Sequence, residues 1–337
     1  MRVFQIQDDW GMDHLQMTTR PDPKPGPGQV LLRMKAASLN YRDLLVPGRG
    51  YGSFTGKLPL IPISDGVGEV VDVGTAVMRV KVGDRVCPCF HQGWIAGAPD
   101  LERLTNTLGG PLDGTMADLM CLSEGGVVKV PAYLSDVEAA TLPCAALTAW
   151  SAIVTYGELP PGSRVLVQGT GGVALFALQF AKLLGAHVTI ISSSDEKIAR
   201  ARQLGADAAI NYTRTPEWAR ATREITGGRG YDQIVELGGE KTLPQSLRCI
   251  RPGGTLSMIG VLSGGMLAAP LGLVVTRQVR LQGITVGHRD GFEAMMRAID
   301  QHQIQPVVDR VFPFEALKEA MAYLKSGAHF GKICIRH

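Results

Sequence analysis

The sequence predicts an α/β protein of two domains, in which a parallel, doubly wound sheet accompanies a smaller domain of short strands. Three observations lead to this prediction. The first third of the chain alternates short strands with turns, the middle alternates apolar strands with helical stretches, and a glycine-rich turn joins one such strand to the next helix. The length of 337 residues also suits two domains, because a single core rarely grows beyond about 250–300 residues.

The first third of the chain has the pattern of strands separated by turns. A Pro/Gly-rich segment at 21–28 precedes an alternating strand predicted at 29–37, and a second strand is predicted at about 67–73. The turn at 81–86 then leads into another strand. Short strands at this spacing are typical of a small barrel rather than of a parallel sheet.

The pattern changes after Pro131. Ser135 followed by Glu138 predicts a capping box that opens a helix reaching about Thr155. Beyond it, apolar strands alternate with helices, which indicates a parallel, doubly wound sheet. The predicted strands are 164–168, 188–191, 232–237 and 255–259, and the predicted helices between the first three run from the glycine turn to Gly185 and from a cap at Ser193 to Gly205. The last fifty residues are predicted to form helices at 292–301 and 314–326 and a strand at 332–336.

The bulk composition limits the class of function. Hydrophobic residues make up 45% and charged residues 19% of the chain, as in soluble globular proteins. A net charge of +3 is too small and too evenly spread to indicate a nucleic-acid or membrane surface. Residues 1–10 carry Asp8 and Asp9 and no apolar run, so we expect no signal peptide. No apolar run of about 20 residues occurs in the sequence, and six cysteines do not make a disulfide framework in a chain of this length. We therefore expect a cytoplasmic protein with reduced thiols and a small-molecule substrate.

The glycine turn predicts a dinucleotide site. The hexapeptide Gly169-Thr170-Gly171-Gly172-Val173-Ala174 fits the pattern G-x-G-x-x-G/A, and an apolar strand precedes it while a helix follows. Glycines let the backbone approach a pyrophosphate, and the N-terminus of the helix stabilises its negative charge.

The end of the next strand bears on the choice of cofactor. Enzymes that use NAD place an acidic residue there to hold the ribose 2′-hydroxyl. This chain has Ser192, Ser193 and Ser194 instead, followed by Asp195 and Lys197. Without a carboxylate to repel it, a 2′-phosphate can accept hydrogen bonds from hydroxyl and lysine groups. The serines would also cap the following helix. We expect NADP(H) as the cofactor.

Three motifs carry a resemblance to a known family. They are Asn40-Tyr41-Arg42-Asp43, the run from Gly68-Glu69-Val70-Val71-Asp72-Val73-Gly74 through Lys81-Val82-Gly83-Asp84-Arg85-Val86, and Val167-Gln168-Gly169-Thr170-Gly171-Gly172-Val173. With these motifs in order along essentially the whole chain, the sequence resembles the medium-chain dehydrogenase/reductases, and within them the zinc-less quinone-oxidoreductase-like branch.

The resemblance implies the fold and the domain boundaries. It implies a GroES-like β-barrel catalytic domain formed by residues 1–145 and 286–337, with a Rossmann NADP(H)-binding domain at 146–285 inserted between them. It also implies a homodimer that forms through the Rossmann domains.

The resemblance also implies roles for individual residues. Asn40 and Tyr51 match polar residues that face the substrate carbonyl, and we expect them to be the catalytic pair. Asp65 matches the acid that neighbours the zinc site in zinc-containing relatives, and we expect it in the substrate pocket. Phe90 and Trp94 are expected there for a different reason, because apolar and aromatic side chains wall such pockets. The remaining matches are to cofactor-binding positions: Thr148, Gly260, Val261, Phe330 and Gly331 beside the nicotinamide, and Lys197 and Tyr212 at the adenosine phosphate.

The same comparison predicts that no zinc binds. A structural zinc needs four ligands, and only Cys87 and Cys89 occur where zinc-containing relatives carry four cysteines. At the positions of the catalytic-zinc ligands, two cysteines and a histidine, this chain has Asn40, Cys144 and Ser64 respectively. An amide and an un-ionised hydroxyl are poor zinc ligands.

The leading hypothesis is therefore a zinc-independent, NADPH-dependent oxidoreductase that passes hydride to a quinone, enone or carbonyl. Two alternatives remain open. One is a zinc-type alcohol dehydrogenase, and the other is a protein that binds NADPH without catalysis, since this fold supports many functions.

Overall fold

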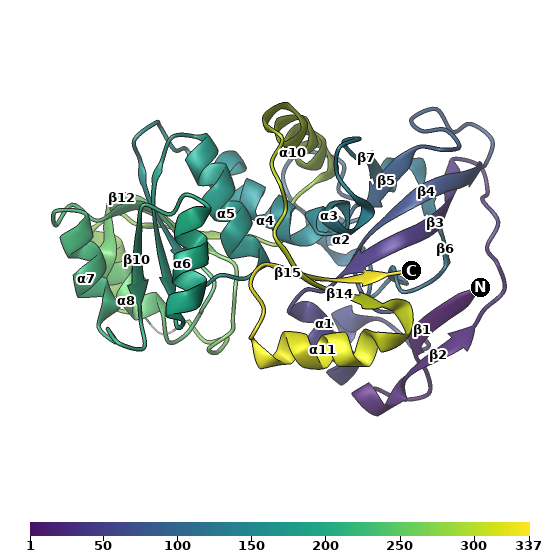
Figure 1. The fold of residues 1–337 in the computed structure, drawn as a ribbon, viewed down its shortest axis with the longest axis horizontal. Coiled ribbons are helices and arrows are strands. Elements are labelled where there is room, and N and C mark those ends of the chain that lie inside the picture. Colours follow the sequence, from purple (N-terminus) through teal and green to yellow (C-terminus); the bar gives the residue numbers. More distant parts are fainter. Residues whose placement is uncertain (268) are drawn as a thin grey trace. The chain divides into compact units, whose positions relative to one another are not determined.

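A computed structural model describes residues 1–267 and 269–337 and divides the chain into two compact units (Figure 1). The first unit consists of Met1–Leu147 together with Val286–His337, and the second of Thr148–Thr285. Both units combine sheets with helices, which confirms the predicted α/β class.

The second unit is built on a six-stranded parallel sheet of order β10-β9-β8-β11-β12-β13. The order reverses between β8 and β11, as in the classic doubly wound fold, and such folds bind ligands where the carboxyl ends of the strands meet this reversal. The strands are β8 (Arg164–Gln168), β9 (His187–Ser192), β10 (Ala208–Asn211), β11 (Tyr231–Glu236), β12 (Ile250–Met258) and β13 (Arg280–Gly283).

Helix α5 (Gly172–Leu183) packs most deeply in this unit because most of its side chains are apolar and buried. In α5, Ala174, Leu178 and Ala181 are buried, as their spacing of three to four residues requires on a helix. The remaining helical segments of this unit are α6 (Asp195–Gln203), α7 (Trp218–Ile225), α8 (Leu243–Cys249), α9 (Leu271–Thr276) and the π-helical η6 (Ser151–Thr155), with α4 (Leu147–Trp150) crossing the boundary between units.

The first unit is organised around β3 (Gln29–Ser38), which pairs with three other strands. The seven-stranded sheet has the order β14-β15-β3-β4-β5-β7, with β6 also on β3, and β1 and β2 form a separate pair. The strands are β1 (Arg2–Ile6), β2 (Leu15–Thr19), β4 (Asp65–Val73), β5 (Arg85–Pro88), β6 (Leu119–Ser123), β7 (Val127–Lys129), β14 (Val308–Pro313) and β15 (Lys332–Arg336). Its longer helices are α10 (Arg289–His302) and α11 (Leu317–Ser326), and its short ones are α1 (Arg42–Leu45), α2 (Leu101–Thr105), α3 (Asp136–Ala139), η1 (Met12–His14), η2 (Val46–Gly48), η3 (Gly52–Thr55), η4 (Glu124–Gly126), η5 (Leu142–Ala146) and η7 (Phe314–Ala316).

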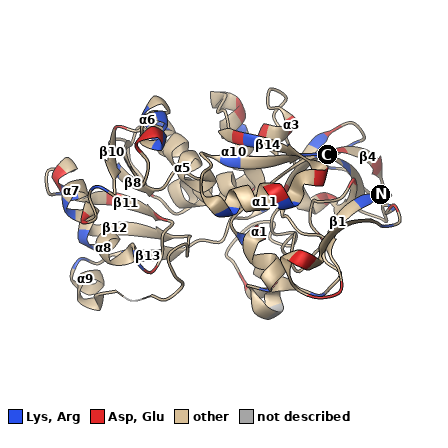
Figure 2. Cartoon of the chain, turned by 60° about the horizontal axis from the view of Figure 1, so that its bottom comes forward, with Lys and Arg blue, Asp and Glu red and all other residues tan. Residues whose placement is uncertain are grey.

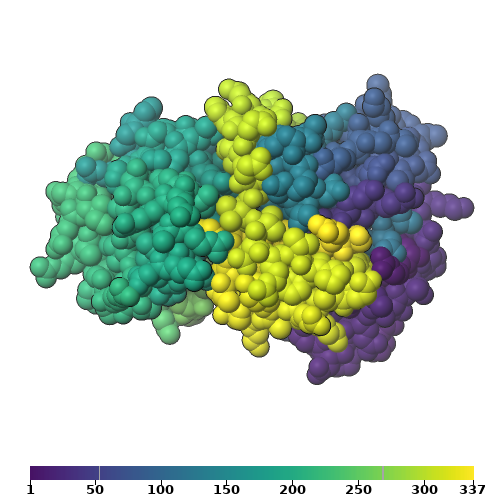
Figure 3. Space-filling model, in the orientation of Figure 1, coloured from purple at the N-terminus to yellow at the C-terminus, as the bar shows by residue number. Residues whose placement is uncertain are grey.

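The C-terminal segment completes this unit. Strand β15 runs antiparallel to β3, with Cys334 opposite Ser38, and the space-filling view shows C-terminal residues against the N-terminal third of the chain (Figure 3). The ring of Phe314 lies 5.4 Å from that of Phe4. Pairing of strands so distant in sequence explains why both chain ends are needed for one core.

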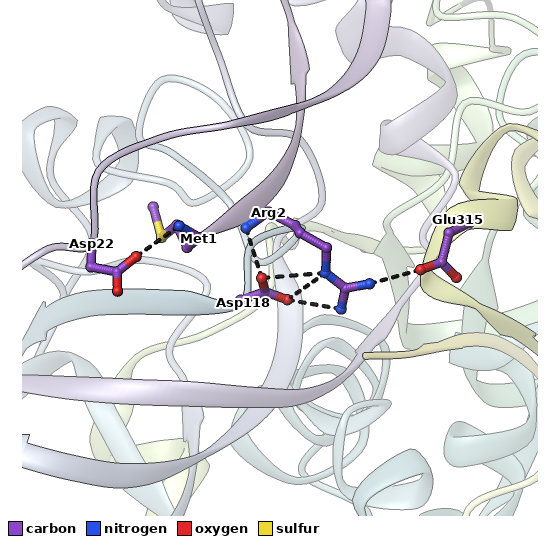
Figure 4. A network of polar contacts seen from close by, with 5 residues as sticks. All are labelled: Met1, Arg2, Asp22, Asp118 and Glu315. Atoms are coloured by element: carbon purple, nitrogen blue, oxygen red, sulfur yellow. Dashed lines mark hydrogen bonds and ion pairs between the residues drawn. The ribbon is translucent and has the colours of Figure 1, made fainter.

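An arginine joins three parts of the first unit at its surface (Figure 4). The guanidinium of Arg2 contacts the Asp118 carboxylate at 3.0 Å and the Glu315 carboxylate at 2.7 Å. The pKa of Asp118 is lowered, since the hydrogen bonds and charge of Arg2 outweigh its partial burial. Exposed ion pairs of this kind contribute about 0–1 kcal/mol each, so the network supplements the apolar core.

Two local predictions differ from the structure. Helix α6 is capped by Ser194, whose hydroxyl accepts from the Lys197 N–H, and not by Ser193. The predicted helix from Ser135 to about Thr155 begins with the expected capping box and ends at Thr155, but it is interrupted at residues 140–141, after α3. From Leu142 it continues without a break through η5, α4 and η6, of which the first and last are π-helical. Pro143, which cannot donate a backbone hydrogen bond, lies within the first π-helical segment.

Positively and negatively charged side chains are mixed on helices of the second unit. Figure 2 shows Lys and Arg next to Asp and Glu on helices such as α6 and α7. Within the part of the chain that the structure describes, no helix has the length and apolar character needed to cross a membrane.

Replacing Phe314 by Ala should lower the free energy of unfolding by about 3–5 kcal/mol, because this ring is 1% exposed and links the two chain ends of the first unit. Urea unfolding measures the change. Met78, which is 91% exposed, provides the control, and Met78→Ala should alter the free energy by less than about 0.5 kcal/mol. Equal stability of the two variants would contradict the packing described for the C-terminal segment.

Candidate active site and cofactor site

The glycine turn lies where the sequence predicts, between β8 and α5. Gly169 has φ of 79°, a left-handed conformation that side chains other than glycine rarely adopt. Its N–H donates to the Ile191 carbonyl at 2.7 Å, which ties the turn to β9. Gly171 is the N-cap of α5 and offers no side-chain cap. Thr170, Gly172 and Val173 continue this turn into the helix, whose first N–H groups therefore point toward the position of an anion.

A buried polar cluster, Gln168 with Glu236, fixes the loop on the other side of the strand-order reversal. The Gln168 amide donates to the Glu236 carboxylate at 2.7 Å, and its oxygen accepts from the N–H groups of Leu237 and Gly238 at 3.1 and 3.0 Å. The other Glu236 oxygen accepts from the N–H of Gly239 at 3.0 Å. These bonds hold two adjacent loops at the carboxyl ends of β8 and β11. This cluster was not predicted, although two long polar residues at the ends of apolar strands are a signal for it.

The residues predicted at the adenosine end come together around β9 and β10. The Tyr212 N–H donates to the Ser192 carbonyl at 3.0 Å. Ser192 is buried, Ser193 is exposed, and Ser194 caps the helix that begins beside Lys197. Ser192 and Ser193 thus stand at the end of β9, where an acid would hold a 2′-hydroxyl, and Lys197 lies in the first turn of α6.

Two further residues modify this end of the site. Asp195 accepts from the Asn211 amide at 2.8 Å and forms an ion pair with Arg214. The only carboxylate in the run 192–195 is therefore paired with a cation, which reduces its repulsion of a phosphate. Neither Asn211 nor Arg214 was predicted.

The remaining cofactor predictions fall in both units. Thr148 is buried at the start of the second unit. Gly260 lies just after β12 and is packed so tightly that an added Cβ atom would lie 2.0 Å from the Leu237 carbonyl oxygen. The neighbouring Val261 is exposed. Phe330 and Gly331 belong to the first unit, where Phe330 is buried and Gly331 has φ of 90°. Their contact with a nicotinamide remains a prediction.

In the first unit, a buried carboxylate gathers residues from four segments. Asp65 begins β4 and is 0% exposed. It accepts from the Ser64 hydroxyl at 2.8 Å and from the Cys144 N–H at 3.1 Å. Burial raises the pKa of Asp65, and the nearby ammonium of Lys332 opposes that rise most strongly, ahead of the hydrogen bonds. Ile63, just before this pair, has φ of 71°, which is strained for a β-branched residue.

Lys332 connects this carboxylate to Asn40. Lys332 is 4% exposed, and its ammonium donates to the Asn40 side-chain oxygen at 2.6 Å and to the Leu39 carbonyl. The Asn40 amide nitrogen is buried and makes no hydrogen bond with the described residues. It lies close enough to Asp65 to lower the pKa of that carboxyl without reaching hydrogen-bond geometry. The predicted catalytic residue Asn40 is thus held between a cation and an anion.

A second buried acid lies one turn further along. The Asn40 N–H donates to Asp43 at 2.7 Å, while the other oxygen of this carboxyl is buried without a partner among the described residues. Burial raises the pKa of Asp43 to about 7, although the charge of Arg42 opposes the rise. Asp43 therefore changes charge near neutral pH.

Tyr51 and Phe90 meet at the guanidinium of Arg42. That group lies 5.6 Å from the Tyr51 ring centre and 4.8 Å from the Phe90 ring centre. Burial raises the pKa of the Tyr51 hydroxyl, and Arg42 opposes this rise. Because Cys144 and Asp43 also influence that pKa, Tyr51 lies near both of these residues. Trp94 packs between His91 and His288, each at 5.5 Å, and its place in the substrate pocket stays a prediction.

The cysteines of this unit are un-ionised. Burial raises the pKa of Cys144 and Cys87 well above the usual range and that of Cys89 to about 12. The Cys87 thiol donates to the Ala139 carbonyl at 3.2 Å. Among the described residues, no group of three or more His, Cys, Asp or Glu side chains is arranged to hold a metal ion.

Comparison with known proteins agrees with this architecture. Residues 26–132 match the family model of the alcohol dehydrogenase GroES-like domain, and residues 172–301 match that of the zinc-binding dehydrogenases. A zinc-type alcohol dehydrogenase-like protein of Schizosaccharomyces pombe is 44% identical over 97% of this chain and 96% of its own. An acryloyl-coenzyme A reductase of Sulfurisphaera tokodaii is 28% identical over 94% of each chain.

Solved structures agree in fold. The crystal structure of a protein of Sinorhizobium meliloti 1021, provisionally assigned as an alcohol dehydrogenase, has a TM-score of 0.94 at 42% identity, and the match covers 100% of this chain and 98% of that one. An NAD-dependent alcohol dehydrogenase matches with a TM-score of 0.90 at 32% identity over 100% of both chains. The crotonyl-CoA carboxylase/reductase AntE, solved with NADP, matches with a TM-score of 0.89 at 25% identity over 100% of this chain and 96% of that one.

These matches span the whole chain and agree with the glycine turn, the strand order and the strand-rich unit formed by both chain ends. The protein is an oxidoreductase whose family uses a pyridine nucleotide, and the chain belongs to the medium-chain dehydrogenase/reductase superfamily.

Proposed function

We propose that the protein is a zinc-independent, NADPH-dependent oxidoreductase of the quinone-oxidoreductase-like branch, which reduces a quinone, enone or carbonyl. The observation that carries this proposal is the bond from Lys332 to Asn40, at 2.6 Å. It places a fixed ammonium beside the residue that stands where zinc-containing relatives have their first cysteine ligand.

The electrostatics of the cluster favour a site without a metal. Burial raises the pKa of the Cys144 thiol, so a zinc ion there would have to displace its proton. The oxygen of Asn40 already accepts from Lys332, and a divalent cation there would be repelled by the ammonium. The ammonium of Lys332 also lies near enough to Asp65 to oppose the rise in the pKa of that carboxyl, so this cluster already holds a cation of its own.

The cofactor supplies the hydride when it is bound, and the residues of this chain position it and polarise the acceptor. The helix α5 N-terminus would hold the pyrophosphate, while Ser192, Ser193, Lys197 and Tyr212 would hold the adenosine phosphate. The Asn40 amide and the Tyr51 hydroxyl would donate hydrogen bonds to the acceptor oxygen, where negative charge develops as the hydride arrives.

We also expect a cytoplasmic homodimer. Strand β13 is an edge of its sheet and pairs with β12 alone within the described residues, so its outer backbone groups can pair with a second copy. Exposed apolar side chains also occur on this strand and on the chain leading to it: Val261, Leu262, Met266, Leu267, Leu271, Val275 and Leu281.

NADPH should bind about tenfold or more tightly than NADH, a difference of about 1.4 kcal/mol or more, because serines replace the acid at the end of β9. Changing Ser192 to Asp should move the preference toward NADH, since the new carboxylate would repel the 2′-phosphate. Fluorescence titration with both cofactors measures the two dissociation constants. The same change at Ser326, which lies in the first unit, is the control and should leave the ratio unaltered. Equal affinities in the unmodified protein would refute this assignment.

Tyr51→Phe should lower the hydride-transfer rate about tenfold or more, because it removes one donor to the acceptor oxygen, while the affinity for NADPH stays the same. Single-turnover oxidation of NADPH with a panel of quinones, enones and aldehydes measures the rate. Tyr41 is as exposed as Tyr51, at 44%, and Tyr41→Phe is the matched control. If both variants reduce the acceptor at the unmodified rate, the Tyr51 hydroxyl is not the donor. NADPH binding by the unmodified protein without turnover on any acceptor would instead favour a non-catalytic binding protein.

Protein purified without added metal should contain far less than one zinc ion per chain, and prolonged treatment with a chelator should leave its turnover unchanged. Both results follow from the poor ligand set around Cys144. Elemental analysis and a turnover assay before and after chelation make the measurement. Near-stoichiometric zinc whose removal abolishes turnover would establish the zinc-type alcohol dehydrogenase alternative.

A further inference from the structure

We infer that Lys332 is a positioning residue that fixes the orientation of the Asn40 amide at the active site. This inference rests on the proposed function and adds to it a residue that lies 292 positions away in sequence from the side chain it orients.

The orientation follows from the chemistry of the two groups. An ammonium donates hydrogen bonds and accepts none, so it can contact only the oxygen of an amide. Lys332 donates to the Asn40 oxygen at 2.6 Å and also to the Leu39 carbonyl. The amide nitrogen of Asn40 must then face away from Lys332. A free asparagine could turn either way, whereas this one presents its donor in a single direction.

The environment makes this contact strong and the alternative costly. Lys332 is 4% exposed and Asp65 is 0% exposed, and a buried ammonium without partners would be highly unfavourable. If the amide were reversed, its nitrogen would face the ammonium and leave the cation without an acceptor there. Because Lys332 is buried and needs acceptors, it keeps the oxygen of the Asn40 amide turned toward its ammonium.

The nitrogen that is left has hydrogen-bonding capacity to spare. It is buried and makes no hydrogen bond to the described residues, and an unsatisfied buried donor is energetically unfavourable. Asp65 lies near enough for Asn40 to lower its pKa, but no hydrogen bond joins that carboxylate to the Asn40 nitrogen. An acceptor oxygen that reaches this nitrogen gains a donor held in place before the reaction begins, which is the condition for effective stabilisation of developing charge.

Lys332→Met tests the inference, because methionine keeps most of the length and loses the donor. We expect the hydride-transfer rate constant to fall roughly 10- to 100-fold, since a misplaced donor at the reacting centre has effects of that order, with unchanged NADPH affinity. Lys332→Arg retains a cationic donor and should recover part of the rate. Lys35→Met is the matched control at a partly exposed lysine paired with Glu69, and it should behave as the unmodified protein.

A double-mutant cycle separates positioning from a general structural effect. If Lys332 acts through Asn40, Lys332→Met should have no further effect on the rate once Asn40→Ala is present. Additive losses in the double variant, or an unmodified rate in Lys332→Met, would overturn the inference. If Lys332→Met does not fold, Asn40→Asp decides, because it preserves the acceptor for Lys332 and lacks the N–H. Its rate should be as low as that of Asn40→Ala, and a rate near that of the unmodified protein would overturn the inference.

Failure of the proposed function has a different signature. If the unmodified protein reduces no member of the acceptor panel, the proposed function fails and the rate measurements do not apply. Crystal structures of Lys332→Met and of the unmodified protein then test the orientation directly. We expect the Asn40 amide to turn in the variant, and an unchanged amide with the same contacts would overturn the inference without reference to activity.

Discussion

A buried carboxylate must be surrounded by hydrogen-bond donors or a positive charge, and Asp65 imposes this constraint on the first unit. The Ser64 hydroxyl, just before β4, and the Cys144 N–H in η5 donate hydrogen bonds to it. Asn40, in the loop before α1, and Lys332, in β15, lie near enough to lower its pKa. Removing any one of them leaves charge or a polar group unsatisfied in the interior. The fold of this unit, with its last strand beside β3, is what brings the required cation to the carboxylate.

The second unit also contains a buried carboxylate, that of Glu236, and satisfies it with neutral hydrogen-bond donors. Glu236 is 0% exposed and accepts hydrogen bonds from Gln168, Ser246 and the N–H of Gly239. These contacts join the ends of β8 and β11, the two strands between which the order of the sheet reverses. In both units, therefore, polar groups buried at strand ends determine the conformation of the loops that carry the candidate site.

Much of the fold could be predicted from the sequence, because periodicity and turns are local. The strand at 164–168, the helix after the glycine turn and the final strand at 332–336 all occur where apolar spacing and glycines indicate them. The observed cap of α6 is Ser194 and the predicted one was Ser193, because any of three consecutive serines can cap a helix and the sequence does not distinguish them. The interruption of the helical stretch between α3 and η5, and the π-helical geometry of η5 and η6, could not be predicted from the capping residues.

The candidate site was less predictable, because its decisive contacts join distant residues. Asn40, Tyr51 and Asp65 were identified by resemblance, but nothing local indicated that Lys332 would be buried. A lysine in a strand is ordinarily expected at the surface. The proposed role of Lys332 becomes visible only in the structure, where Asn40 and Asp65 lie near its ammonium. The same reasoning applies to Arg42, whose guanidinium brings together Tyr51 and Phe90.

Lys332 supplies the positive charge beside Asn40 in this proposal, and no zinc ion binds there. Anomalous diffraction tests this most directly. Crystals grown with both zinc and NADPH would be measured at the zinc absorption edge. We predict no anomalous peak at a bonding distance of about 2.3 Å from the Cys144 sulfur, with Lys332 still bonded to Asn40. A peak bonded to that sulfur, with Lys332 displaced from Asn40, would contradict the account.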